Sequence, residues 1–475
     1  MMTIRTSLLW TAFASAFVLR TQIGADDAPI LRSQPQQSYS YVRFDLLNGS
    51  DSGDCFRNYP HLRRRFTFEQ LDFFCQQKRR YDEVIGEHQE FQPFSENQRA
   101  YIDSLKRRPN DTGSQFNLPK AVRREVRLLS NVSRLRFAAA LRSLIASKVD
   151  GVSKYDLIAT LSHPSLAPGA HVGAAFLPFH REYLRIFELA LRLENPLLEG
   201  LPYWDSTLDS RLPDPAASVV WTAPLFGTGI GDVVSGPAKD KSFEFENVSS
   251  AGRVNADSEV EGSGQAEETA GSATEADLTT LEARSPAIAL SRNVSSASGG
   301  PLTDDEAAYI RSRTRFSEFS TCVNPTVERA GRSVQSFVGG SMGSVYYSAQ
   351  DFVFFLHHAF LDSLWEGARS AKVYANEYAP QGEVCSDYHS AQAAMLPFGP
   401  PLRNVDGIDD VYTNVYYEYE PGWSVSQLNC TLDSHYVGNE CYQSRCSVRT
   451  RSCVKMLSAA KLIQRILRLK RKKTQ

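Results

Sequence analysis

Three of the nine histidines lie within eighteen residues, in the stretch SHPSLAPGAHVGAAFLPFHREYLRIFE. The pattern predicts that His163 ends one helix, that His171 lies in the following loop and that His180 lies in the first turn of the next helix. Two helices and their loop can therefore point three imidazoles at one spot. Three neutral imidazoles suit copper or zinc and leave a coordination position open for a substrate or O2. The alternative is three unrelated polar histidines. No cysteine or carboxylate lies among them to complete a structural zinc site, which favours a catalytic or oxygen-binding metal.

A second histidine pair lies in the middle of an apolar run, DFVFFLHHAFLDSLWEG, at residues 351–367. Such a run is typical of a buried helix, where His357 and His358 need partners that compensate for their removal from water. Adjacent residues on a helix point about 100° apart, so the two imidazoles face different neighbours. We expect one of them to serve a site and the other to pack or hydrogen-bond nearby.

These motifs resemble those of the tyrosinase family. HVGAAFLPFHREYLRIFE is similar to the first copper motif of the family, and LPYWDSTLDSRLPDP is similar to the segment that follows it in secreted invertebrate members. SFVGGSMG with DFVFFLHHAFLDSLW resembles the second copper motif, and CSDYHSAQAAMLPFG is also family-like. The resemblance covers roughly residues 119–240 and 302–420. It implies a mainly α-helical domain whose central four-helix bundle holds two coppers, which bind O2 and oxidise phenols or catechols to quinones.

The resemblance also implies a set of metal ligands. His163, His171 and His180 would hold the first copper. In the second motif the ligand would be His358, and Asp362, one helical turn further on, would orient the site.

Two ligands that the family supplies are missing from this chain. The family places them as His-x-x-x-His just before Val-Gly-Gly, and the corresponding residues are Gly331 and Gln335. The usual Asp-Pro of the second motif is Asp351-Phe352. No other histidine is a convincing replacement, since two lie in the N-terminal extension and two stand apart from any helix pair expected to reach the site: His61, His88, His389 and His435.

Three functions follow from these residues. The favoured hypothesis is a tyrosinase-like copper protein with copper at the first site, one ion rather than the two of the family, and with impaired or lost dicopper oxidase activity. The second is an active secreted tyrosinase or catechol oxidase that uses O2 and a phenolic small molecule. The third is a mononuclear copper-binding or structural extracellular protein.

Several features agree with secretion. An apolar stretch behind Arg5 predicts a signal peptide over residues 1–25, and the chain has eight cysteines, an even number. Six Asn-x-Ser/Thr acceptors occur: Asn48, Asn110, Asn131, Asn247, Asn293 and Asn429. The formal net charge of −2 gives no argument for a nucleic-acid partner, and no membrane contact is expected beyond the signal peptide.

The rest of the chain divides by composition. Residues 26–118 are predicted to be an N-terminal extension, 119–422 the tyrosinase-like domain, and 423–475 a Cys-rich tail with a basic end. Within the domain, the helix that carries His180 is expected to expose a charged face, formed by Glu182, Arg185, Glu188 and Arg192. Residues 246–300 contain no aromatic side chain and are predicted to be a disordered insertion.

The insertion gives a first prediction. Limited proteolysis should cut first between residues 250 and 300, because a segment without aromatic residues cannot bury enough apolar area to offset its ordering entropy. The fragments should stay associated on a sizing column. Full protection of this region, assayed by mass spectrometry of the fragments, would contradict the prediction.

Overall fold

The computed structural model describes residues 94–107, 118–243, 287–321, 326–370, 377–380 and 386–420. Single positions at 71, 72, 75, 78, 79 and 324 and the backbone of 444–447 and 452–455 are also described. The chain divides into two units, Met1–Val42 and Arg43–Gln475, and every described residue belongs to the second unit. The predicted signal peptide, most of the Cys-rich tail and residues 246–286 of the predicted insertion therefore lie outside the described residues.

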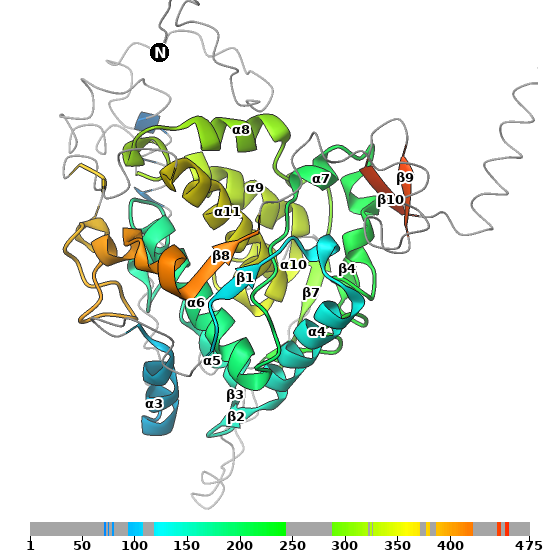
Figure 1. The fold of residues 1–475 in the computed structure, drawn as a ribbon, viewed down its shortest axis with the longest axis horizontal. Helices are drawn as coiled ribbons and strands as arrows, with labels where there is room; N and C mark the ends of the chain where they lie inside the picture. Colours follow the sequence, from blue (N-terminus) through cyan, green and yellow to red (C-terminus); the bar gives the residue numbers. More distant parts are fainter. Residues whose placement is uncertain are drawn as a thin grey trace, which may run out of the picture. The chain divides into compact units, whose positions relative to one another are not determined.

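The described chain is mainly helical, as predicted (Figure 1). The α-helices are α3 (Glu96–Leu105), α4 (Asn131–Ala146), α5 (Lys154–Thr160), α6 (Phe176–Glu194), α7 (Thr207–Ser210), α8 (Asp304–Ser312), α9 (Thr326–Val338), α10 (Gly340–Gly343) and α11 (Phe352–Ser370). The strands form two-stranded ladders: parallel β1 (Ala121–Arg123) with β8 (Tyr417–Tyr419), and antiparallel β2 (Lys148–Val149) with β3 (Val152–Ser153), β4 (Ile230–Asp232) with β7 (Ser291–Asn293), β5 (Ser242–Phe243) with β6 (Ile288–Ala289), and β9 (Ser444–Ser447) with β10 (Ser452–Lys455).

Helices α6 and α11 form the centre of the core. Helix α6 packs against α4 and α11, and α11 packs in turn against α8 and α9. Aromatic side chains fill the α6–α11 contact, where the rings of Phe187 and Phe355 stack with centroids 3.7 Å apart. Stacked and edge-on rings add to the free energy of burial by about 0.5–1.5 kcal/mol per pair. The four elements that carry the predicted site positions, α5 with its following loop, α6, α9 and α11, thus belong to one core.

The charged face of α6 is buried, which corrects the sequence-based expectation. Arg185 donates to the carboxylate of Glu182, and Glu188 accepts two hydrogen bonds from Arg123. Arg192 donates to the backbone carbonyls of Leu198 and Pro119. Periodicity shows which residues share a face, but it does not show that strand β1 and neighbouring loops bring partners to it.

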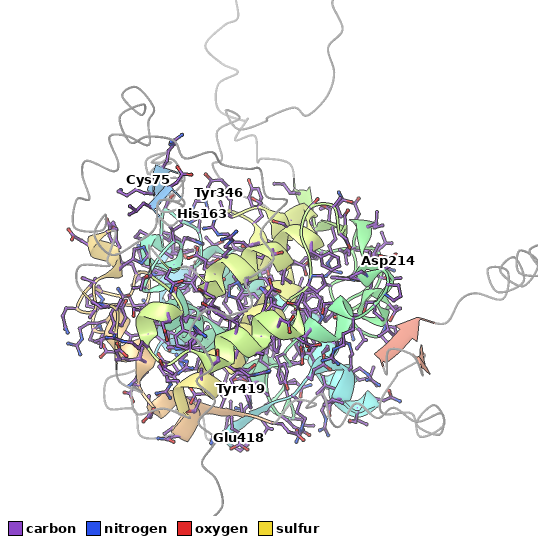
Figure 2. The ribbon with its side chains drawn as sticks, turned by 90° about the horizontal axis from the view of Figure 1, so that it is seen from above. Cys75, His163, Asp214, Tyr346, Glu418 and Tyr419 are labelled. Atoms are coloured by element: carbon purple, nitrogen blue, oxygen red, sulfur yellow. The ribbon has the colours of Figure 1, made fainter. Side chains whose placement is uncertain are left out.

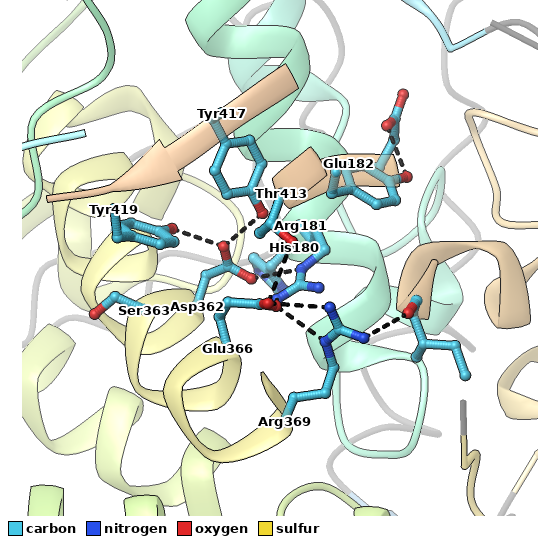
Figure 3. Close-up of polar contacts among 12 residues, drawn as sticks. His180, Arg181, Glu182, Asp362, Ser363, Glu366, Arg369, Thr413, Tyr417 and Tyr419 are labelled. Atoms are coloured by element: carbon cyan, nitrogen blue, oxygen red, sulfur yellow. Dashed lines mark hydrogen bonds and ion pairs between the residues drawn. The ribbon is translucent and has the colours of Figure 1, made fainter. Parts of the chain in front are cut away.

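A carboxylate on α11 is the hub of the buried polar network (Figure 3). Asp362 accepts a hydrogen bond from Nε of Arg181 at 2.8 Å, and the hydroxyls of Tyr417 and Tyr419 donate to its other oxygen at 2.7 and 2.6 Å. The guanidinium of Arg123 lies 3.5 Å from the same oxygen and 3.5 Å above the Tyr417 ring. These contacts join α6, α11, β1 and β8.

The pairing of β1 with β8 explains how two tyrosines reach one carboxylate. Side chains alternate along a strand, so Tyr417 and Tyr419 lie on one side and Glu418 on the other. Tyr417 is buried, Glu418 is exposed, and the parallel register places Tyr419 opposite Arg123.

The helical domain starts earlier than residue 119. Helix α3 packs against α5 and α6, and its Ile102 and Leu105 are buried in the main hydrophobic cluster. The backbone N–H of Arg107 donates to Glu182 and its side chain to Asp409. Amphipathic spacing in this polar segment was too weak to predict its place in the core.

The last part of the predicted insertion, 287–300, is ordered. Its strands β6 and β7 pair with β5 and β4, and Leu290 and Val294 are buried between them and the core. Arg292 is buried as well, with its guanidinium on the carboxylate of Asp351. A few aliphatic side chains and one arginine anchor this segment to the core, although it contains no aromatic residue. Within the described residues, no helix combines the length and apolar character needed to cross a bilayer.

The Asp362 network gives a second prediction. Asp362→Asn leaves Arg123 and Arg181 buried with less than their countercharge, so it should lower the free energy of unfolding by about 3–5 kcal/mol. The exposed pair of Lys120 with Glu418 provides a matched control, and Glu418→Gln should change it by about 0–1 kcal/mol. Urea unfolding followed by circular dichroism measures both. Equal effects of the two substitutions would contradict the prediction.

Candidate metal centre

The three histidines of the first set lie where the sequence predicted, with small shifts. Helix α5 ends at Thr160, three residues before His163. His171 ends the short 3-10 turn Pro168–Ala170, and His180 is the fifth residue of α6 rather than in its first turn. His163 and His180 are buried, whereas His171 is partly exposed. The ring of Tyr346 lies beside that of His163, with centroids 5.3 Å apart (Figure 2).

The hydrogen bonds of these rings decide which nitrogen is left for a metal. Nδ1–H of His180 donates to the carbonyl of Phe176 at 2.8 Å, which leaves the Nε2 lone pair. Nε2–H of His171 donates to the carbonyl of Ser162 at 2.9 Å, which leaves Nδ1. Nδ1 of His163 accepts a long bond, 3.3 Å, from the N–H of Ser165. Two of the three rings are thus held in the tautomer that offers a lone pair, in the way that backbone carbonyls orient metal-binding histidines.

The loop that carries His171 is strained and tightly held. Val172, a β-branched residue, has φ 54°, a backbone conformation that costs of order 1–3 kcal/mol for such a residue. Its N–H donates to Glu328 at 2.8 Å, and the hydroxyl of Ser320 donates to the carbonyl of Gly173 at 2.8 Å. Strain of this kind persists only where surrounding contacts over-determine the backbone, and it clusters at functional sites.

The second set contains a histidine and an amide. His358 on α11 stacks on His180, with ring centroids 4.1 Å apart and planes at 10°. Its Nε2 accepts a hydrogen bond from the side-chain amide of Gln335 on α9 at 3.2 Å. The lone pair that would face a metal is therefore already in use.

The second vacant ligand position is filled by packing. A Cβ on Gly331 would lie 2.9 Å from Cδ1 of Leu361 and 3.4 Å from Nε2 of His357. His357 is fully buried beside Trp204, and neither of its ring nitrogens has a hydrogen-bond partner among the described residues. The expectation that His357 packs nearby rather than serving the predicted site agrees with this arrangement.

Asp362 does not hydrogen-bond the predicted ligand His358, so it does not orient that ring directly. Its oxygens pair with Arg181, Tyr417 and Tyr419, and Nδ1 of His358 has no hydrogen-bond partner among the described residues. Positions four apart share a helix face, but Arg181 and the two tyrosines compete for the carboxylate, and charge-assisted bonds are the stronger ones.

His389 is the residue that sequence reasoning missed. The structure places it, fully buried, against the loop of the first set, where the N–H of Ala175 donates to its Nδ1 at 3.4 Å. Its ring lies over Gly173, since a Cβ there would meet three ring atoms at 2.9 Å. The only signal in the sequence was the family-like stretch around it, CSDYHSAQ, because no spacing rule connects residues 173 and 389.

The three imidazoles of the first set suit copper by residue type, but their positions do not form a metal site. Within the described residues, no three His, Cys, Asp or Glu side chains converge closely enough to hold a metal ion. The first set has three imidazoles, two with a lone pair available, and the second has one imidazole already hydrogen-bonded. The first set has enough imidazoles for a metal but they do not converge in this structure, whereas the second set lacks donors.

Comparison with known proteins places this centre in a family. Residues 138–367 match the model of the common central domain of tyrosinase. The tyrosinase of Streptomyces glaucescens is 30% identical over 255 residues, which are 51% of this chain and 81% of that protein. The chain belongs to the tyrosinase family.

Other tyrosinase relatives are longer than the matched region. Tyrosinase-like protein 1 of Margaritifera margaritifera is 31% identical over 68% of this chain and 61% of its own length. A tyrosinase-like protein of Caenorhabditis elegans is 31% identical over 64% of this chain, which spans only 39% of that relative. Among solved structures, a polyphenol oxidase variant from Thermothelomyces thermophila aligns with 75% of this chain and 99% of its own, with 16% identity and a TM-score of 0.43. Relatives of this tyrosinase family imply a copper cofactor and, in general, phenols and O2 as reactants.

The buried imidazoles give a third prediction, on pH dependence. Burial lowers the pKa of His163 to about 4 and those of His180, His357 and His389 to about 3. The unfolded chain therefore binds more protons than the native chain below pH 6.5, so stability falls as the pH drops from about 6.5 toward 4. Each such group contributes a slope of about 1.4 kcal/mol per pH unit in that window.

The variant His357→Phe tests this slope in metal-free protein. An apolar ring at a position whose nitrogens lack partners should make the acid dependence shallower by one group's contribution, measured by urea unfolding at pH 4.5, 5.5 and 6.5. The exposed substitution Glu418→Gln should leave the slope as it is. An unchanged slope in His357→Phe would show that this imidazole is already protonated in the native state.

Proposed function

We propose that this chain is a tyrosinase-family protein that binds one copper ion through His163, His171 and His180 and has lost the dicopper oxidation of phenols and catechols. The observation that carries the proposal is the hydrogen bond from Gln335 to Nε2 of His358, because it occupies the last imidazole of the second set. A copper ion at the second set would supply redox chemistry only together with a copper ion at the first set. Gln335 offers an amide and Gly331 no side chain, so neither supplies an imidazole to hold the second ion.

Support for the first copper comes from the donor chemistry of its set. Imidazole nitrogens suit copper, and the carbonyls of Phe176 and Ser162 fix His180 and His171 in tautomers with a lone pair available. His163 completes the set when its long bond from Ser165 opens. Burial keeps His163 and His180 neutral, with pKa values of about 4 and 3, so no proton competes with the metal near pH 7.

Support for the loss of the second copper comes from the packing around position 331. An imidazole built on Gly331 would have to displace the methyl group of Leu361 that lies 2.9 Å from its Cβ. Interiors are close-packed, and enlarging a side chain in them forces neighbours to move. Position 331 is thus a packed contact between α9 and α11, which a histidine could enter only if the end of the Leu361 side chain moved.

We also propose that the protein is secreted. Cys75 is disulfide-bonded, and the antiparallel register of β9 and β10 pairs residue Cys446 with residue Cys453 along the backbone. The acceptors Asn131 and Asn293 are both exposed, as glycosylation requires.

The fourth prediction concerns copper content. Purified protein loaded with copper and desalted should retain one ion per chain and should not oxidise a simple catechol, because the second set offers no free imidazole. Removing any imidazole of the first set, for example by His180→Ala, should abolish retention. Two retained ions per chain with catechol oxidation in the unmodified protein would contradict the proposal and favour an active oxidase.

Restoring the second set needs three changes. Gln335→His and Gly331→His supply the imidazoles, and Leu361→Ala makes room for the second of them. Retained copper should rise toward two ions per chain in the triple variant and should rise less without Leu361→Ala. Gln335→Leu with Leu361→Ala is the matched control, since it opens the same space without adding donors and should leave the copper content at one.

A further inference from the structure

The loop from His171 to Ala175 leads from the segment after α5 into α6. The direction of its backbone determines where the His171 ring points. Three contacts from other elements hold it, from Glu328 to Val172, from Ser320 to Gly173, and from His389 to Ala175. The contact with His389 differs from the other two because the face of its ring also packs on the backbone of Gly173.

His389 lies in a segment that is held by hydrogen bonds from Asn404 and Tyr378. It ends the 3-10 turn Asp387–His389, whose neighbours are pinned by Asn404, with its side-chain amide donating to the carbonyls of Tyr388 at 2.7 Å and Ser390 at 2.9 Å. The hydroxyl of Tyr378 donates to the carbonyl of His389 itself at 3.0 Å.

Residues 388 and 389 lie close to two glycines, Gly173 within the loop and Gly169 just before it. A Cβ on Gly173 would lie 2.9 Å from the His389 ring, and a Cβ on Gly169 would lie 3.1 Å from the carbonyl oxygen of Tyr388. The approach at Gly173 is closer than a side chain would allow, and the approach at Gly169 is tight. Such close contact fixes the backbone on both sides of His171.

We propose that His389 is a positioning residue for the metal centre, which holds the backbone of residues 171–175 so that the His171 ring donates from Nε2 to Ser162 and offers Nδ1 to the metal. The imidazole accepts from Ala175 through Nδ1 and also faces the backbone of His171. Both contacts are to backbone, so His389 acts through the loop and is not itself a ligand. Ala175 precedes the first residue of α6, so the same contact ties the loop to the helix that carries His180.

A purely space-filling role would be served better by an apolar ring. Burying an imidazole costs free energy unless its polar atoms are used, and His389 is fully buried. Phenylalanine would fill a similar volume without that cost but would leave the Ala175 N–H without its acceptor.

The test compares variants that separate the ring from the acceptor. His389→Phe keeps the ring and removes the acceptor, whereas His389→Asn keeps an acceptor near the place of Nδ1 and removes the ring. Ile310→Val, a buried substitution on α8 away from the loop, controls for a general loss of stability. The readouts are the tautomer of His171 in metal-free protein, from ¹⁵N NMR of histidine-labelled samples assigned with His171→Gln, and the affinity for Cu(I), from competition with a chelator.

The expected result is that His389→Phe shifts His171 from the Nε2–H form to a mixture and weakens copper binding by about 10–100-fold, the usual effect of removing a group that orients a ligand. His389→Asn should keep the tautomer and most of the affinity, and Ile310→Val should change neither. If His389→Phe does not fold, His389→Gln, whose polar end falls at the place of Nε2 instead, should behave as predicted for His389→Phe.

An unchanged His171 tautomer in His389→Phe or His389→Gln would overturn the proposal. This inference rests on the proposed function, since it takes His171 as a copper donor, but the two fail separately. Unmodified protein that binds no copper would contradict the proposed function, and the tautomer measured without metal would still decide the role of His389.

Discussion

One carboxylate, on Asp362, sets the relation between the two central helices. Arg181 follows His180 directly on α6, and Asp362 lies one turn beyond His358 on α11, so the pair between them fixes the register of the two helices. The stacking of His180 on His358 is a consequence of that register. Because the network is fully buried and hydrogen-bonded, its contribution depends on all its members remaining together.

This arrangement explains how the fold accommodates a glycine and a glutamine at positions 331 and 335. The contacts that hold α6 against α11 include the Arg181–Asp362 pair, the stack of Phe187 on Phe355 and the stack of His180 on His358, and none of them involves α9. Gly331 and Gln335 on α9 then pack against His357, Leu361 and His358 as ordinary core residues. The packing of the two central helices therefore does not require imidazoles at positions 331 and 335.

The sequence was sufficient to predict the helical class and the helices of both motifs, because periodicity and local motifs carry that information. It was misleading for α6, whose Glu188 pairs with Arg123, a strand residue 65 positions away in sequence. It was also misleading for Asp362 and His389, whose partners come from residues 181, 417 and 419 and from residues 173 and 175. Side-chain choice among several long-range partners depends on tertiary structure, which no spacing rule in one chain contains.

The parallel pairing of β1 with β8 joins residues 296 positions apart, so the end of the domain packs late in folding. During synthesis, Arg123, Arg181 and Asp362 all leave the ribosome long before Tyr417 and Tyr419. Contacts of such large sequence separation slow folding, and until they form, the charged hub lacks its hydroxyl donors and the covering aromatic rings. A chain cut short before Tyr417 would keep every histidine of the centre and still lack the two side chains that close its core. The core of this domain is thus completed only after strand β8 has been synthesised.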